Sequence, residues 1–306
     1  MQSIIHLLKR IDETSKQRNE AEKNPNFLNE PWRKIHETLT DVPQLKETLV
    51  NNISESWHKT ETSLKILLLG QAGSGKSSFV NACLTALLQE GRVVKRAVDG
   101  AVGSENITEG LTHYKLKIKT GKKTENLPVQ LVDFRGLSKG DKGVQTGDIE
   151  KICRGYIKAG YLINPKEGIK SNDKMYRQHP QEKDKIHCVV YVLAADEEVF
   201  VQDEVLDQFK TIKRMFRKDM PQLILLTKID RLGIDDITQI FRDKRVKERC
   251  KAAANTLNLC DNDVYPQSSY SDEVVPCDYK DVVTLFNIKT IMERANDFLS
   301  TPESSD

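Results

Sequence analysis

The sequence predicts an α/β fold in which six strands form a mostly parallel sheet flanked by helices. Three observations lead to this prediction. Short apolar runs alternate along the chain with longer segments whose apolar residues recur at helical spacing, as in strand–helix–strand units. A glycine-rich turn joins the first apolar run to the first helical segment. Two later apolar runs end in acidic motifs, D-x-x-G and T-K-x-D, which parallel strands would bring to the same edge of the sheet.

The composition excludes several classes of protein. Lys and Arg (47) nearly balance Asp and Glu (45), and no block of basic residues predicts binding to nucleic acid. The six cysteines form neither a C-x-x-C pair nor a zinc spacing, so we expect a reducing, cytoplasmic location. The start, MQSIIHLLKRIDE, does not have the pattern of a signal peptide. No run approaches the ~20 apolar residues of a transmembrane helix.

Residues 1–62 are predicted to form a helical extension before the main domain of residues 63–300, and residues 301–306 a disordered tail. Residues 1–23 should form a short amphipathic helix that docks on the main domain, associates with a second copy or lies on a membrane surface. A Pro- and Asn-rich linker, NPNFLNEPW, follows, and its apolar side chains should anchor it to a surface. Residues 39–57 should form a second helix.

The clearest chemical motif lies between a predicted strand, residues 64–69, and a predicted helix, residues 75–89. The stretch KILLLGQAGSGKSSFVNAC fits G-x-x-x-x-G-K-S/T, and its strand and helix flanks argue against a chance match in a glycine-rich turn. Glycines let the backbone approach an anion, which the loop amides and the helix N-terminus then surround. Lys76 should reach the β- and γ-phosphates, and the Ser77 hydroxyl should bind Mg²⁺. The predicted nucleotide contacts here are Gly70, Gln71, Ala72, Gly73, Ser74, Gly75, Lys76, Ser77 and Ser78.

The next predicted strands lead to the second motif. Residues 91–110 read as a mobile loop, residues 113–119 as an edge strand and residues 121–126 as a turn. A buried strand over residues 128–132 follows this turn and leads into Asp133, which opens the D-x-x-G sequence that closes at Gly136. Asp133 can hold Mg²⁺ through water, and the Gly136 amide can sense a γ-phosphate.

The middle of the chain is less informative. We expect a flexible segment over residues 138–147, a helix over residues 148–159 and a polar insertion over residues 161–185. A buried strand, residues 186–194, follows, and His187 at its start is predicted to be structural rather than catalytic. A long helix should then cover residues 197–217.

The third motif selects the base. A strand over residues 222–226 runs into Thr227, Lys228 and Asp230. The Asp230 carboxylate can accept hydrogen bonds from the N1–H and the 2-amino group of guanine, a donor pair that adenine lacks. The Lys228 stem can lie over the base while its ammonium returns to the phosphate loop.

The last segments complete the predicted sheet and its cover. We expect a helix over residues 235–257 and a short sixth strand over residues 263–267. Ser268 and Ser269 follow this strand, in a turn whose backbone amides could meet guanine O6. A closing helix over residues 280–299 should direct one face inward, consisting of Val282, Leu285, Ile288, Ile291 and Phe298.

Taken in order, the three motifs resemble a Ras-like GTPase domain of the P-loop NTPase fold over residues 64–299. More narrowly, NEPWRK, KILLLGQAGSGKSSFVNA, ENITEGLTHYKLKI and TKID resemble the interferon-induced protein 44 and 44-like family. This resemblance implies a cytoplasmic, interferon-inducible protein linked to antiviral or antiproliferative responses. It also assigns the switch threonine that caps Mg²⁺ to Thr108, with Thr112 as the alternative, and so groups Thr108 with Lys76 and Gly136 as catalytic.

One position departs from the pattern of small GTPases. Many of them carry Gln directly after the D-x-x-G glycine, where it orients the attacking water, but this chain has Leu137. Arg135 beside it could act as an internal cation or form an exposed ion pair.

We therefore expect a GTP/GDP-binding switch with slow, Mg²⁺-dependent hydrolysis, a nucleotide-dependent homodimer and a further protein partner. Two alternatives remain. One is a non-catalytic scaffold that nucleotide stabilises. The other is a P-loop ATPase, which is disfavoured because Phe134 rather than Glu follows Asp133 and because T-K-x-D has no role there.

Overall fold

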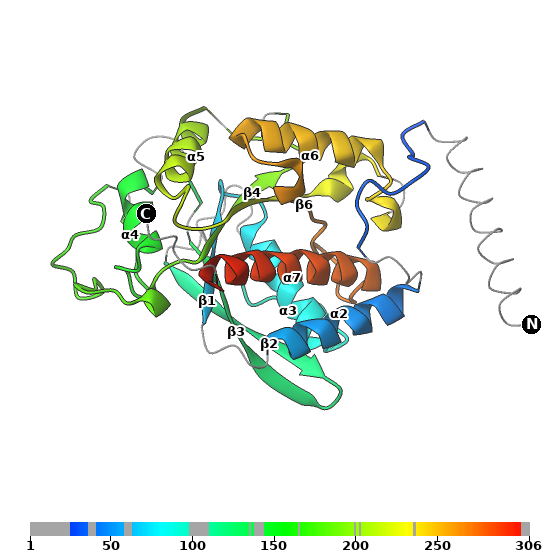
Figure 1. Ribbon diagram of the computed structural model, residues 1–306, viewed down its shortest axis with the longest axis horizontal. Coiled ribbons are helices and arrows are strands. Elements are labelled where there is room, and N and C mark those ends of the chain that lie inside the picture. Colours follow the sequence, from blue (N-terminus) through cyan, green and yellow to red (C-terminus); the bar gives the residue numbers. More distant parts are fainter. Residues whose placement is uncertain are drawn as a thin grey trace, which may run out of the picture.

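Six strands form the central sheet of the computed structural model (Figure 1). The structure describes residues 25–35, 41–57, 63–97, 110–134, 136–137, 144–164, 166–198, 200–201, 203–234 and 237–300. The strands are β1 (Leu64–Leu69), β2 (Thr112–Thr120), β3 (Lys123–Asp133), β4 (Cys188–Ala194), β5 (Gln222–Thr227) and β6 (Val264–Pro266). The helices are α2 (Val42–Trp57), α3 (Lys76–Leu88), α4 (Thr146–Cys153), α5 (Asp203–Met215), α6 (Lys244–Leu257) and α7 (Asp278–Ser300). Short 3₁₀ turns are η2 (Glu182–Asp184), η3 (Ile229–Leu232), η4 (Ile237–Gln239) and η5 (Asp261–Asp263).

The strand order is β2-β3-β1-β4-β5-β6. Strand β1 pairs in parallel with β3 and β4, β5 pairs in parallel with β4 and β6, and only β2 runs antiparallel, at the edge beside β3. This arrangement confirms the predicted class, a mostly parallel six-stranded sheet flanked by helices. It also brings the carboxyl ends of β1, β3 and β5, where the three motifs begin, to one edge of the sheet.

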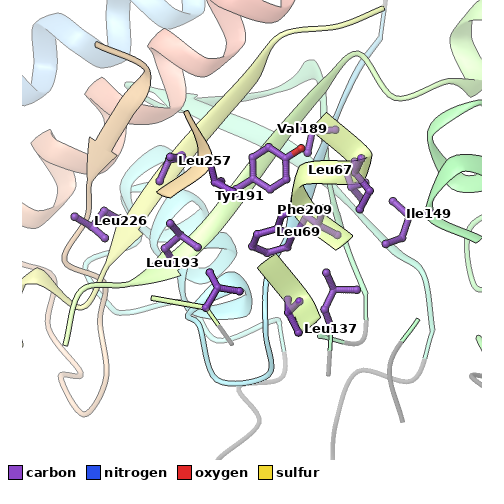
Figure 2. Packing of buried hydrophobic residues seen from close by; sticks show 14 of the residues in the cluster. Leu67, Leu69, Leu137, Ile149, Val189, Tyr191, Leu193, Phe209, Leu226 and Leu257 are labelled. Carbon is purple, nitrogen blue, oxygen red and sulfur yellow. The ribbon is translucent and has the colours of Figure 1, made fainter. Parts of the chain in front are cut away.

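Side chains alternate between two hydrophobic clusters because successive residues of a strand face opposite sides of a sheet. On one face, Leu67 and Leu69 of β1 and Tyr191 of β4 join the apolar sides of α4, α5 and α6. Figure 2 shows this cluster, in which Phe209 of α5 packs beside Tyr191, with ring centroids 5.0 Å apart.

The opposite face lies beneath α2, α3 and α7 (Figure 1). The intervening residues Ile66 and Leu68 of β1 point to this side. Helix α2 buries one apolar stripe there, made of Leu45, Leu49, Val50, Ile53 and Trp57. The extension before residue 63 therefore contributes to the same core as the strands. The division at residue 62 stays a prediction, and the predicted helix over residues 1–23 lies outside the described residues.

Several predicted boundaries were wrong for local reasons. The predicted turn at 121–126 is shorter, because Gly121 adopts a positive φ of 59° and β3 already begins at Lys123. The predicted helix 148–159 ends earlier, at Cys153, and Gly155 follows with a φ of 82°. The predicted helix 235–257 starts later, because the Asp243 side chain caps α6 by accepting hydrogen bonds from two backbone amides.

Two other expectations need correction. The predicted helix 197–217 is shorter, since α5 begins at Asp203 and ends at Met215. Phe298 was expected to face inward with the other apolar residues of the closing helix. It is 38% exposed, because it lies in the last turn of α7, beyond the buried residues that end at Ala295.

The first part of the predicted mobile loop, residues 91–97, is attached to helix α3. The Asn81 side chain accepts hydrogen bonds from the backbone amides of Arg96 and Ala97, each at 2.8 Å, and the Thr85 hydroxyl accepts one from Val94 at 2.9 Å. Val94 and Ala97 are buried. The rest of that predicted loop, including Thr108, lies outside the described residues.

His187 has the structural role that its position predicts. Its Nδ1 accepts a hydrogen bond from the Lys65 backbone amide at 2.9 Å, and its own amide donates to the Lys65 carbonyl at 2.8 Å. Burial lowers the pKa of this histidine, so the neutral ring is favoured. The side chain thus fastens the start of β4 to β1, at the end of the strand opposite the motifs.

Within the described residues, no helix is both long and apolar enough to cross a membrane.

Candidate functional site

The loop between β1 and α3 requires glycine at three positions. Gly73 and Gly75 have φ values of 74° and 95°, in the left-handed region that side chains rarely adopt. A Cβ on Gly70 would lie 2.5 Å from the Val192 carbonyl oxygen, closer than non-bonded atoms approach. The loop therefore lies tightly against the carboxyl ends of its neighbouring strands, with the first turn of α3 directly behind it.

Lys76 turns back over this loop. Its ammonium donates hydrogen bonds to the carbonyl oxygens of Gly70 at 3.1 Å and Gln71 at 2.9 Å. Burial lowers the pKa of Lys76, and the charge of Asp133 opposes that effect in part. A buried cation held mainly by neutral carbonyls gains from a bound anion, so the arrangement suits a phosphate group.

The first two motifs meet at the side chains of Ser77 and Asp133. The Ser77 hydroxyl donates a hydrogen bond to Asp133 Oδ2 at 2.8 Å. A hydroxyl and a carboxylate are the oxygen ligands that Mg²⁺ prefers, so this pair fits the predicted metal. The described residues contain no group of three His, Cys, Asp or Glu side chains that could hold a metal ion.

Of the two candidates for the switch threonine, Thr112 is among the described residues. Thr108 lies outside the described residues. Thr112 begins β2, where it pairs with Asp133 of β3, and its hydroxyl lies 3.4 Å from the Gly110 carbonyl oxygen. Thr112 is therefore close to the motif, on the edge strand of the sheet.

The D-x-x-G segment packs directly on the phosphate loop. A Cβ on Gly136 would lie 2.3 Å from the Ala72 nitrogen, so only glycine fits here. The next amide, that of Leu137, donates to the Gly70 carbonyl at 3.0 Å. The Leu137 side chain is 1% exposed and points into the hydrophobic cluster of Figure 2, away from solvent. Arg135 lies outside the described residues.

The third motif is joined to the phosphate loop by Thr227. Its hydroxyl lies 2.6 Å from the Ser74 carbonyl oxygen and 3.0 Å from that of Leu193, and its side chain lies against Gly75. The end of β5 thereby fixes the middle of the loop. Ser78, the last residue of the predicted loop contacts, lies in the first turn of α3.

Asp230 is oriented by the turn after β6. The Ser268 hydroxyl donates to Asp230 Oδ1 at 3.0 Å, and Ser268 itself is buried. The next residue, Ser269, accepts a hydrogen bond from Lys280 at its carbonyl, and its hydroxyl has no partner among the described residues. We call residues 267–269 the serine turn. The structure therefore brings together Asp230 and the serine turn, which the sequence assigned separately to the base.

The predicted return of the Lys228 ammonium to the phosphate loop is not seen. Lys228 has a left-handed φ of 56°, and its ammonium lies 3.5 Å from Asp196 Oδ1. Asp196 also pairs with Arg231 at 3.1 Å. The Lys228 ammonium pairs with the Asp196 carboxylate, which follows β4, because β4 runs beside β5 and its end lies within reach.

Sequence reasoning missed the residues that support the serine turn. Gln267 donates to the Thr284 hydroxyl at 2.9 Å, and Asn287 donates to Gln267 Oε1 at 2.9 Å. All three are buried. Helix α7 carries Asp281, Thr284 and Asn287 at three-residue intervals, so a polar row within its inward face was the available signal.

Comparison with known proteins gives relatives for most of the chain. A family model described as a protein of unknown function (DUF815) matches residues 13–108. The chain is 31% identical over 267 residues to interferon-induced protein 44 of Homo sapiens, which covers 85% of this chain and 59% of the relative. It is 29% identical over 245 residues to human interferon-induced protein 44-like, which covers 78% of this chain and 53% of that relative. The chain thus spans less than two thirds of the length of these relatives.

Among solved structures, the chain resembles a dimerization-deficient mutant of Toc33 from Arabidopsis thaliana. The identity is 17% and the TM-score is 0.45, over 88% of this chain and 97% of that chain. A likeness at this level carries no argument about function. The strand order and the motif positions of this chain support the fold by themselves.

Proposed function

The chain is related over 85% of its length to the interferon-induced protein 44 family, and on that premise we propose that it binds guanine nucleotide as a switch with slow, Mg²⁺-dependent GTP hydrolysis. The names of the relatives support the further proposal that this chain is induced by interferon. A cytoplasmic location belongs to the same proposal. A nucleotide-dependent homodimer and an additional protein partner belong to the same proposal.

One observation carries the nucleotide assignment: the three motifs converge at the carboxyl edge of the sheet. Ser77 contacts Asp133, and Thr227 contacts the Ser74 carbonyl. Beyond Thr227, the carboxylate of Asp230 is held by the turn after β6. A motif that matched by chance would not be expected to meet two others in this order.

The chemistry of binding follows from these groups. Loop amides and the Lys76 ammonium would hold the β- and γ-phosphates, and Asp230 would accept the N1–H and 2-amino hydrogens of guanine. The residues Ser77, Asp133 and Thr108 would hold Mg²⁺, which when bound neutralises charge on the phosphates. The Gly136 amide would sense the γ-phosphate, because its backbone already lies against the loop.

Slow hydrolysis is proposed because the residue directly after Gly136, Leu137, has no side-chain group that could orient water. The Leu137 side chain cannot form hydrogen bonds, and it is buried in the core rather than directed at the nucleotide. The same observation favours a second candidate function, a scaffold that binds nucleotide for stability without turning it over. Adenine specificity is disfavoured, since an acid at residue 230 offers no match to the adenine edge.

The test is calorimetry with GDP, GTP and ADP in the presence of Mg²⁺, at two protein concentrations that also report self-association. We expect binding of GDP and GTP and none of ADP. Asp230→Asn should weaken GDP binding and improve binding of xanthosine diphosphate, because an amide can donate to the xanthine 2-oxo group. An unchanged preference would argue against the base assignment. Phosphate release followed over hours separates the slow enzyme from the scaffold.

A further inference from the structure

The described parts of the N-terminal segment, residues 25–35 and 41–57, reach the base end of the site although they precede the phosphate loop in the sequence. The first link is Lys46 of α2. The Lys46 ammonium lies 2.7 Å from Asp281 Oδ2 and 2.8 Å from Asp278 Oδ1, both on α7. The Asp281 side chain is 1% exposed. This ion pair therefore crosses from the N-terminal segment into the interior of the molecule.

Asp281 continues the link to the serine turn. The Tyr270 hydroxyl donates to Asp281 Oδ1 at 2.6 Å and accepts a hydrogen bond from the Cys277 amide at 3.0 Å. Tyr270 lies two residues after Ser268, whose hydroxyl holds Asp230. Polar contacts thus connect Lys46 to Asp230 through Asp281 and Tyr270, with only the short backbone stretch between Tyr270 and Ser268 in between.

A second link starts at Arg33. Its guanidinium donates to the carbonyl oxygens of Val264 at 2.5 Å and Asp261 at 3.0 Å. The same group lies 5.1 Å and 5.4 Å from the ring centroids of Trp32 and Tyr265. Val264 and Tyr265 belong to β6, which leads directly into the serine turn. The N-terminal segment therefore holds the chain on both sides of that turn.

These polar links are not needed merely to attach the segment. Helix α2 already buries an apolar stripe against the sheet, and Trp32 packs on Phe241 with ring centroids 5.5 Å apart. Burying an ion pair is often no more stabilising than burying well-packed apolar side chains of similar size. A charged group in the interior does, however, define where its partner must lie. These links are therefore best understood as fixing the position of the serine turn.

We propose that Lys46 and Arg33 are positioning residues for the base-binding turn of residues 267–269, so that docking of the N-terminal segment sets the affinity for guanine. This inference rests on the proposed function. It predicts that loss of either link weakens contacts to the base and leaves contacts to the phosphates unchanged.

The experiment compares Lys46→Met with the unaltered chain in competition against fluorescent GDP. The competitors are GDP, IDP (which lacks the 2-amino group) and pyrophosphate. We expect GDP affinity to fall roughly tenfold, as for one displaced hydrogen bond to a charged group. The ratio of GDP to IDP affinity should fall toward one, while competition by pyrophosphate stays the same. A loss of stability alone would lower all three affinities together.

Three further variants test the specificity of the effect. Lys46→Arg should restore the ratio. Tyr270→Phe keeps the buried ring, removes only the hydroxyl and should reproduce the effect of Lys46→Met. Lys289→Met is the matched control, because it also removes a lysine ammonium, one that pairs with Glu293 within α7. It should leave the ratio unchanged.

A second readout does not depend on nucleotide. Hydrogen exchange of the amides at residues 268–277 should be faster in nucleotide-free Lys46→Met than in Lys289→Met. An unaltered chain that binds no guanine nucleotide would overturn the proposed function. Unchanged exchange at these amides, with an unchanged GDP to IDP ratio in a chain that binds GDP, would overturn the positioning role alone.

Discussion

The phosphate end and the base end of the candidate site are built in different ways. At the phosphate end, the contacts join short motif stretches: Lys76 to Gly70 and Gln71, and Ser77 to Asp133. At the base end, Asp230 depends on the serine turn. Residues of α7 and of the N-terminal segment, which are far away in the sequence, hold this turn and the strand before it by direct hydrogen bonds. The residues of the first end can thus be recognised from short motifs in the sequence, whereas the support of the second end depends on residues that carry no motif. Substitutions at the two ends should therefore affect nucleotide binding in different ways.

The largest effect is expected from Lys76→Ala. It removes the only ammonium group that contacts the phosphate loop among the described residues, so affinities for GDP and pyrophosphate should both fall on the order of 100-fold. This corresponds to about 3 kcal/mol, the upper range for a hydrogen bond to a charged group. Titration of labelled GDP measures it. Lys115→Ala, on the exposed edge strand, is the control. Full affinity in Lys76→Ala would remove the distinction between the two ends.

A smaller effect, still confined to the phosphate end, is expected from Gly136→Ala. The new methyl would lie 2.3 Å from the Ala72 nitrogen, so the loop must shift. We expect GDP and IDP affinities to fall together by about tenfold, within the 1–3 kcal/mol range for overpacking. Gly147→Ala is a matched control, since a Cβ there meets nothing within 4 Å and alanine favours the helix. A selective loss of GDP over IDP would contradict the assignment.

The smallest effect is expected from Thr227→Val, which tests whether the two ends are coupled. Valine keeps the shape but removes the hydroxyl between the Ser74 and Leu193 carbonyls. The free energy of unfolding should fall by about 1–2 kcal/mol, as when a buried acceptor loses its donor. Urea unfolding measures this change. Thr290→Val, whose hydroxyl contacts only its own helix, should cost less. Equal costs would mean that Thr227 does not couple the ends.

The same contrast explains what sequence reasoning achieved. The bounds of β1 follow from local patterns, and the start of α3 and the ends of β3 and β5 lie within one residue of the predicted ones. Apolar runs, glycines and motif spacing act over a few residues, so they can be read directly.

The missed features depend on partners far along the chain. Arg33 donates a hydrogen bond to the Val264 carbonyl, 231 residues away in the sequence. The Lys228 ammonium pairs with Asp196 instead of returning to the phosphate loop. Composition and periodicity do not state which carboxylate a lysine will reach. The polar row on α7 could have been noticed as an exception to an apolar face, but its function as a support for the serine turn required the fold.

The apolar stripe of α2 has a practical consequence. Leu49, Ile53 and Trp57 are each at most 4% exposed, and they cover part of the face formed by β2 and α7. A protein trimmed to begin at Ser63, where the motifs suggest a natural start, would leave that face open to water. An exposed apolar patch of this kind promotes aggregation, so the truncated protein should precipitate even with every nucleotide motif intact.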